Sequence, residues 1–158
     1  MLQQYDKIMV AVDGSDEAEL AFKKAVSVTQ RNDGELLLVH VIDTRAFQTI
    51  SSFDGMMAEQ ATEMAKQTLD DYVRYAKENG VTKVSYVVEY GSPKAIIAKD
   101  IPTKNHVDLI MLGATGLNAV ERLFIGSVSE YVIRNASCDV LVVRTDETNK
   151  LPVADSAK

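Results

Sequence analysis

Three of the eight glycines in the sequence, Gly113, Gly116 and Gly126, fall within fourteen positions, and a serine, Ser127, follows the last of them. Glycine permits positive φ and lets the main chain approach a ligand closely. If the segment opens a helix, the first N–H groups of that helix are unpaired and carry about half a positive charge. Such a segment is typical of an anion site: a triphosphate would lie across Gly116 and the first helical turn, with hydroxyl donors from Ser127 and Ser129. The alternative for two glycines alone is a connecting loop with a serine cap.

The elements that position this segment alternate between strand and helix. Continuous apolar runs predict strands that are buried on both faces, and apolar residues at helical spacing predict amphipathic helices. We expect strands over residues 8–12, 35–42, 82–90, 107–112 and 138–144. We expect helices between Ser15 and Asn32, over 56–79, from Pro93 to an end near Pro102, and over 127–135, with a polar, flexible stretch at 43–55.

This order of elements predicts the fold class. Alternating strands and helices form an α/β domain, here a single doubly wound, open, five-stranded parallel sheet of order 3-2-1-4-5 with helices on both faces, which is a Rossmann-like architecture. Such sheets bind ligands beyond the carboxyl ends of their strands, where successive connections leave in opposite directions. The residues at that point are 13–15, after the first strand, and 113–116, after the fourth. Residues 1–145 would make up the domain and residues 146–158 a polar tail.

Composition argues against several classes of protein. A length of 158 residues suits one domain with one core. Seventeen Lys and Arg against 23 Asp and Glu give a net charge of -6, which opposes binding to nucleic acid or to an anionic membrane. The single cysteine cannot form an internal disulfide, and with two separated histidines it does not make a metal site. The chain starts without a signal-peptide pattern, and no run approaches the roughly 20 apolar residues of a membrane span, so we expect a cytoplasmic protein.

Other conspicuous side chains have structural interpretations. We expect His40 in a buried strand, His106 in a surface loop and Cys138 in the core as a small hydrophobe. Three methionines, Met56, Met57 and Met64, are expected to take part in helix packing.

The full spacing of the glycine segment carries a family resemblance. The run GATGLNAVERLFIGSVSEYVIRNASCDVLVVR resembles the signature of the universal stress protein family, whose ATP-binding branch has glycine, two residues, glycine, nine residues, then glycine with serine or threonine. Gly113, Gly116, Gly126 and Ser127 match every position. The start KIMVAVDGS and the strand LLLVHVID are also similar to family segments, so the resemblance covers nearly the whole chain. The chain departs from the pattern at 114–115 and at 43–55, where members vary.

The resemblance implies an ATP site and a role for each matching residue. It places Asp13 at the ribose, the main chain of Val41 at the adenine and Gly113 beside the ribose. The phosphates would be held by Gly116, Gly126, Ser127, Val128 and Ser129, and the lining would be completed by Ala11, Val12, Leu112 and Thr115. From the residues alone, Asp13 is equally a turn or helix-cap residue, and Val41 is a core strand residue.

The same segment argues against efficient catalysis. It lacks the Gly-Lys-Ser/Thr ending of a P-loop, and Arg122 is its only basic residue. Phosphoryl transfer needs positive charge at the phosphates, a metal held by the protein and a group that orients the nucleophile. No acidic pair and no histidine base accompany the segment, so Mg²⁺ would be held mainly through the phosphates. We expect ATP to be retained, with slow or no hydrolysis.

Retention predicts a nucleotide-dependent stress-response regulator or sensor, whose protein partner the sequence does not name. The last strand, at 138–144, is apolar and would lie at the sheet edge, and the resemblance implies a homodimer through it. Three alternatives stay open. They are a nucleotide-using enzyme, such as a weak ATPase or an adenylate-transferring protein; a flavodoxin-like redox module, which the short 13–15 turn and the lack of tryptophan disfavour; and an interaction module without nucleotide.

Overall fold

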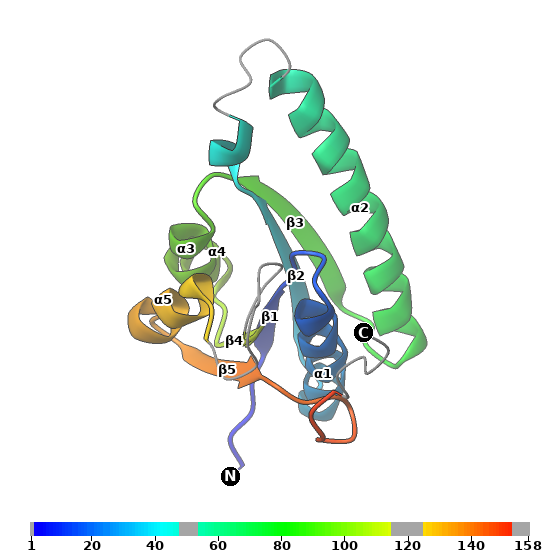
Figure 1. Cartoon of the computed structure of the whole chain (residues 1–158). Helices are drawn as coiled ribbons and strands as arrows, with labels where there is room; N and C mark the ends of the chain where they lie inside the picture. Colours follow the sequence, from blue (N-terminus) through cyan, green and yellow to red (C-terminus); the bar gives the residue numbers. More distant parts are fainter. Residues whose placement is uncertain (1, 48–53, 115–124, 153–158) are drawn as a thin grey trace.

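The strands form one parallel sheet, and their order confirms the predicted fold. The computed structural model describes residues 2–47, 54–114 and 125–152 of the chain. Within these residues the strand order is β3-β2-β1-β4-β5, and every neighbouring pair is parallel (Figure 1). The strands are β1 (Lys7–Ala11), β2 (Glu35–Ile42), β3 (Val84–Tyr90), β4 (Leu109–Gly113) and β5 (Asp139–Val143).

Helices cover both faces of this sheet, as the sequence predicts. One face carries α1 (Asp16–Asn32) and α2 (Asp54–Glu78); the other carries α3 (Pro93–Ala95), η2 (Ile96–Asp100), α4 (Ile101–Asn105) and α5 (Ser127–Asn135). On the first face Phe22 stacks on Tyr72, with ring centroids 4.2 Å apart. On the second face Ile97 and Val132 belong to the same buried cluster as Ile110 of β4. None of the helices in the described part of the chain is long and apolar enough to cross a bilayer.

Helix α1 begins where its local sequence provides a cap. The Ser15 hydroxyl oxygen accepts a hydrogen bond from the Ala18 N–H at 3.1 Å, and acidic residues fill the first turn, where the helix end is positive. The helix ends at Asp33, which adopts the left-handed conformation with φ 50°. The capped start of α1 therefore directly follows the turn at the end of β1.

The prediction that the third helix ends near Pro102 is wrong. Helical structure runs from Pro93 to Asn105 through a π turn, η2, in which the Ile101 N–H donates to the carbonyl oxygen of Ile96. Proline has no N–H, so a regular helix would leave a carbonyl unpaired one turn before it. The wider π turn comes just before the proline and lets the chain stay helical. The helix ends only at His106, which has φ 55° and an exposed side chain.

Three strands, β3, β4 and β5, are shorter than predicted, and β5 spans Asp139–Val143 instead of 138–144. β4 begins at Leu109 rather than at 107, and the preceding Asp108 carboxylate accepts hydrogen bonds from the N–H groups of Asp6 and Lys7, at 2.8 Å and 3.1 Å. These bonds tie the start of β1 to the start of β4. β3 likewise begins at Val84 rather than at 82.

The methionines of α2 do not pack as predicted. Met56 and Met64 are 62% and 69% exposed, and Met57 is half-buried. The helix turns Ala65 and Leu69 toward the sheet instead, and both are buried. Part of the predicted flexible stretch before α2 is also regular, because a 3-10 helix, η1, spans Thr44–Phe47; residues 48–53 lie outside the described chain.

The polar tail is hydrogen-bonded as far as it is described. Lys24 of α1 donates to the Thr145 hydroxyl at 2.6 Å and to the Asn149 side chain at 3.0 Å. The Asp146 carboxylate accepts from the main chain and hydroxyl of Thr148 and from the Lys150 N–H, and the Thr148 hydroxyl lowers the pKa of that carboxyl. The segment that follows β5 is thus held against α1.

Candidate functional site

The candidate site lies at the carboxyl ends of β1 and β4, where the connections diverge. β1 pairs with both β2 and β4; the chain leaves β1 toward β2 and α1, and leaves β4 toward β5 on the other side (Figure 1). Val12 is buried at this point, whereas Asp13 and Gly14 are exposed. This is the switch point that the sequence predicts for ligand binding.

Asp13 stabilises the turn after β1. Its Oδ1 accepts hydrogen bonds from the Ser15 N–H at 3.0 Å and from the Ser15 hydroxyl at 2.5 Å, and Gly14 between them has φ 87°. The turn interpretation of Asp13 is therefore correct. The carboxylate also has a second oxygen, Oδ2, with no hydrogen-bond partner among the described residues. An exposed carboxylate oxygen at the switch point can accept hydrogen bonds from ligand hydroxyl groups.

The close packing of α1 on β4 explains why residue 113 is a glycine. A Cβ built at this position would lie 3.0 Å from the main-chain carbonyl carbon and oxygen of Glu17. Real Cβ atoms rarely come so close to main chain, so the glycine lets α1 pack directly on the end of β4. The glycine that opens the predicted phosphate segment is thus explained by packing alone, whatever ligand it faces.

Two hydrogen bonds bring the start of α5 back to the end of β4. The Gly126 N–H donates to the carbonyl oxygen of Ala114, and the buried Ser129 hydroxyl donates to that of Gly113, both at 2.8 Å. The Ser129 hydroxyl hydrogen is therefore already engaged, which differs from the expectation that it donates to a phosphate. Only the main-chain N–H of Ser129 remains for that role.

The first turn of α5 presents N–H donors that no side chain of the described residues caps. The first helical bond runs from the Glu130 N–H to the Gly126 carbonyl oxygen at 2.9 Å, so the N–H groups of Ser127, Val128 and Ser129 have no acceptor within the helix. Gly126 occupies the N-cap position without a side chain that could accept from them. Glu130 in the first turn pairs with Arg134 at 3.0 Å. Among the described residues, the positive end of α5 therefore lies next to the end of β4 without a side-chain cap.

A strip of half-buried apolar side chains lies on the α5 face of the sheet, near its carboxyl edge. Ala11, Val41 and Val87 pack against the cluster that contains Val128 and the buried Leu112. Leu112 is only 4% exposed, so its side chain is part of the core. The half-buried Ala11 and Val41 of the strip lie at the ends of β1 and β2, near Asp13.

The sequence predicts only a structural role for His40, in a buried strand, but the structure adds a hydrogen bond across strands. His40 is half-buried, and its Nδ1 lies 2.8 Å from the carbonyl oxygen of Val12. No local pattern indicates this contact, because the two residues are 28 positions apart. Three residues of the predicted segment, Thr115, Gly116 and Arg122, lie outside the described residues, so their predicted roles stay predictions.

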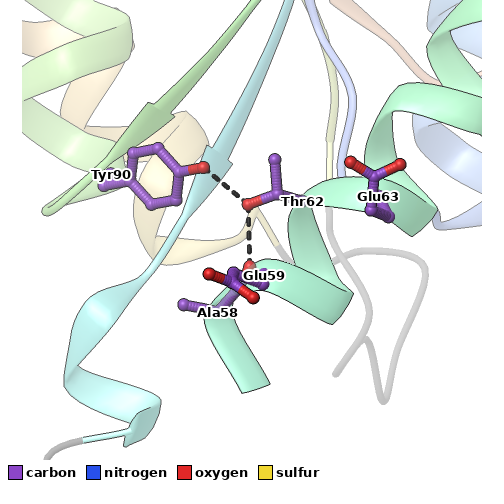
Figure 2. A pocket seen from close by; sticks show the side chains of 5 residues that line it. All are labelled: Ala58, Glu59, Thr62, Glu63 and Tyr90. Atoms are coloured by element: carbon purple, nitrogen blue, oxygen red, sulfur yellow. Dashed lines mark hydrogen bonds between the residues drawn. The ribbon is translucent and has the colours of Figure 1, made fainter. Parts of the chain in front are cut away.

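Other polar groups lie away from this site. A hollow of about 360 Å³ between α2 and the end of β3 is lined by Ala58, Glu59, Thr62, Glu63 and Tyr90, and Figure 2 shows Thr62 bonded to the Tyr90 hydroxyl at 2.5 Å. It belongs to the face that α1 and α2 cover, opposite α5. Cys138 is half-buried against the α5-side core, and burial raises the pKa of its thiol. The described residues hold no cluster of three His, Cys, Asp or Glu side chains that would suit a metal ion.

Comparison with known proteins identifies the family. The sequence profile of the universal stress protein family matches residues 4–144. The chain belongs to the universal stress protein family. A universal stress protein of Staphylococcus haemolyticus is 50% identical over 143 residues, covering 90% of this chain and 87% of that protein. The structure of the universal stress protein UspA from Lactobacillus plantarum is similar with a TM-score of 0.81 and 32% identity, over 90% of this chain and 100% of the other.

A further universal stress protein, whose crystal structure is a complex with cAMP, has the same fold, with a TM-score of 0.69 at 21% identity over 89% of this chain and 98% of the other. Family membership makes the present universal stress protein a stress-response protein with a Rossmann-like sheet. The glycine, serine and aspartate positions at its switch point belong to the matched region.

Proposed function

We propose that this universal stress protein binds ATP at the switch point and acts as a nucleotide-dependent regulator of the stress response. The observation that carries the proposal is the start of α5, where the described residues supply no side-chain cap and no acceptor for the first N–H groups, at the same sheet edge as the exposed Asp13 carboxylate. An anion at a helix N-terminus is stabilised by both the N–H donors and the helix dipole.

The residues at the site fit the three parts of a nucleoside triphosphate. The N–H groups of Ser127, Val128 and Ser129 would hold phosphate oxygens, with Gly126 leaving them uncovered. Oδ2 of Asp13 would accept from ribose hydroxyls while Oδ1 keeps the turn. The apolar strip of Ala11 and Val41 suits a planar base, with Val12, Leu112 and Gly113 supporting it from the strand ends. Thr115 and Gly116 complete the proposed set.

The proposal includes retention rather than rapid turnover. Mg²⁺ would be held mainly through the phosphates, because the described residues offer no metal cluster of their own. Without a P-loop lysine or a histidine base in the segment, little positive charge would offset the charge that develops during phosphoryl transfer. A nucleotide-using enzyme, the alternative function, requires those groups. A phosphate-release assay with ATP and Mg²⁺ would show slow or no turnover.

We further propose that the protein forms a homodimer through β5 and works in the cytoplasm with a protein partner still to be found. β5 is one of the two edge strands of the described sheet, opposite β3. The Val143 carbonyl oxygen accepts a hydrogen bond from the Ala114 N–H at the end of β4. Main-chain groups alternate in direction along a strand, so those of Val140 and Val142 point outward, away from β4. An apolar edge of this kind pairs readily with a second copy around a two-fold axis. ATP at a hundredfold excess over its Kd would stabilise the folded state by about 2.7 kcal/mol, and it would bias this interface to the extent that the dimer binds it more tightly than the monomer.

The direct test is to ask what the purified protein carries. Denaturing the purified protein should release ATP, which mass spectrometry would detect. Calorimetric titration of nucleotide-free protein should give tighter binding for ATP than for ADP, AMP or cAMP. The cAMP arm matters because a universal stress protein of the same fold has been crystallised with cAMP. If cAMP binds and ATP does not, the triphosphate assignment is wrong. If no nucleotide binds, the interaction-module alternative replaces the proposal.

A further inference from the structure

Val12 directly precedes Asp13, the proposed ribose ligand, and both its N–H and its carbonyl oxygen form hydrogen bonds with β2. Its N–H donates to the carbonyl oxygen of Val39 at 2.9 Å. Its carbonyl oxygen lies 2.8 Å from Nδ1 of His40. A carbonyl oxygen only accepts, so Nδ1 carries the hydrogen and donates, and in the neutral ring Nε2 is the acceptor. The strand register between β1 and β2 ends one residue earlier, at Ala11 opposite Val39.

The imidazole occupies a place that a regular parallel ladder gives to the main chain. In a parallel pair, a residue donates to one residue of the neighbouring strand and accepts from the residue two positions further on. Because the Val12 N–H donates to Val39, the regular partner of the Val12 carbonyl oxygen is the N–H of Val41. The ring of His40 takes that carbonyl instead.

The consequence falls on the main chain of Val41. Main-chain groups of a strand alternate in direction, and bonds from Leu36 to Lys83 and from Gly91 to Ile42 show that the even-numbered residues of β2 face β3. The N–H and C=O of Val41 therefore face β1, at the point where β1 turns away. In the described part of the chain they have no hydrogen-bond partner on that side.

We propose that His40 is a positioning residue: by taking the Val12 carbonyl oxygen, its ring keeps the Val41 main chain out of the sheet and available to the edge of a ligand base. The inference rests on the proposed nucleotide function for its ligand, and on the hydrogen-bond pattern alone for its structural half. A base whose edge offers an acceptor beside a donor matches the N–H and C=O of one strand residue. The same histidine fixes the Val12 peptide and thereby the position of Asp13.

Two substitutions separate the donor from the bulk of the ring. His40→Leu removes the donor and leaves the Val12 carbonyl oxygen to the Val41 N–H. His40→Asn keeps a donor, because the amide nitrogen of asparagine lies about where Nδ1 lies. The measurements are amide hydrogen exchange of Val41 by NMR without nucleotide, the Kd for ATP by calorimetry, and the urea midpoint as a check on folding.

We expect the Val41 amide to exchange rapidly in the wild type and in His40→Asn, and to become protected in His40→Leu. ATP should bind about tenfold more weakly to His40→Leu, as expected for the loss of one hydrogen bond to the base, while His40→Asn stays near the wild-type Kd. A ring that served only packing would lower the urea midpoint without protecting Val41. His106→Asn leaves His40 as the sole histidine, so its ¹⁵N spectrum directly reports whether Nδ1 carries the hydrogen.

The outcomes distinguish the two proposals. If the wild type fails to bind ATP but Val41 becomes protected in His40→Leu, the proposed function fails and the role of His40 stands. If ATP binds and His40→Leu binds it equally well, the role of His40 is refuted and the function stands. A Val41 amide that is already protected in the nucleotide-free wild type, or an Nε2–H tautomer, also refutes it.

Discussion

Replacing Gly126 by aspartate should stabilise the fold and, at the same time, weaken nucleotide binding. Gly126 occupies the N-cap of α5 with φ -63° and ψ 161°, extended angles that any residue adopts, so a side chain brings no backbone strain. Aspartate is a better N-cap than glycine, because its carboxylate accepts from the N–H groups of the first turn. Those N–H groups are the ones proposed to hold the phosphates. The new side chain would therefore compete with the ligand for the same donors.

The substitution should raise the free energy of unfolding and lower the affinity for ATP. The cap and the favourable charge at the positive helix end should together add about 0.5 to 1 kcal/mol to the free energy of unfolding. For a chain of this length that corresponds to a rise in Tm of about 2 to 4 °C per kcal/mol. Between a carboxylate and a phosphate about 4 Å apart, repulsion at an effective dielectric constant of 20 is about 4 kcal/mol. Even half of that, about 2 kcal/mol after screening by salt, would weaken binding about thirtyfold.

Urea unfolding of the nucleotide-free protein and calorimetric titration with ATP measure the two effects separately. Gly126→Asn is the matched control, because asparagine caps a helix as well as aspartate but carries no charge. It should give a smaller gain in stability, because it lacks the favourable charge at the helix end, and a smaller loss of affinity. If Gly126→Asp is stabilised as expected and binds ATP as tightly as the wild type, the phosphates do not lie at α5. If the variant is destabilised instead, the reasoning about the uncapped helix start is wrong.

Three further predictions follow from individual contacts. Asp13→Asn keeps an Oδ1 acceptor for Ser15 but loses the carboxylate, so the affinity for ATP should fall by about 1 to 3 kcal/mol in a calorimetric titration while the urea midpoint changes little; equal affinity would make Asp13 a turn residue only. Gly113→Ala places a Cβ against Glu17, so unfolding in urea should show a loss of about 1 to 3 kcal/mol even without nucleotide, and an unchanged midpoint would contradict the tight packing of α1 on β4. Val142→Pro removes an outward-facing N–H from the edge strand without touching the bonds to β4, so sedimentation should change from dimer to monomer; a dimer that persists would place the interface elsewhere.

Much of the fold was predictable because its signals are local. Each buried strand is a continuous apolar run, and each long helix has its apolar residues on one face, so the order of elements and the strand order 3-2-1-4-5 follow from pattern and chain connectivity. The sequence pattern gives a wrong prediction where tertiary packing or an irregular helical turn changes which residues pair or pack. Pro102 normally marks the end of a helix, but the π turn before it lets the helix continue to Asn105. Met56 and Met64 have helical spacing, but α2 packs through Ala65 and Leu69.

The sequence shows the glycine and serine spacing of the candidate site, but it does not show which contacts the individual residues make. Gly113 is required by the approach of α1, and the Ser129 hydroxyl is engaged by the carbonyl of Gly113. Both contacts join elements that are distant in the sequence. No periodicity or motif contains them, because a hydrogen-bond partner depends on which strands and helices become neighbours.

The sequence by itself determined the alternation of strands and helices, the switch point at residues 13–15 and 113–116, and the glycine-rich start of α5. Only the tertiary structure decided which donors remain unpaired there. The ring of His40 takes the Val12 carbonyl oxygen, and the main chain of Val41 faces β1 without a hydrogen-bond partner among the described residues. The physical reason is that strand propensity is a property of a short segment, whereas each carbonyl oxygen is shared among competing donors. Which donor reaches it depends on where β1 leaves β2.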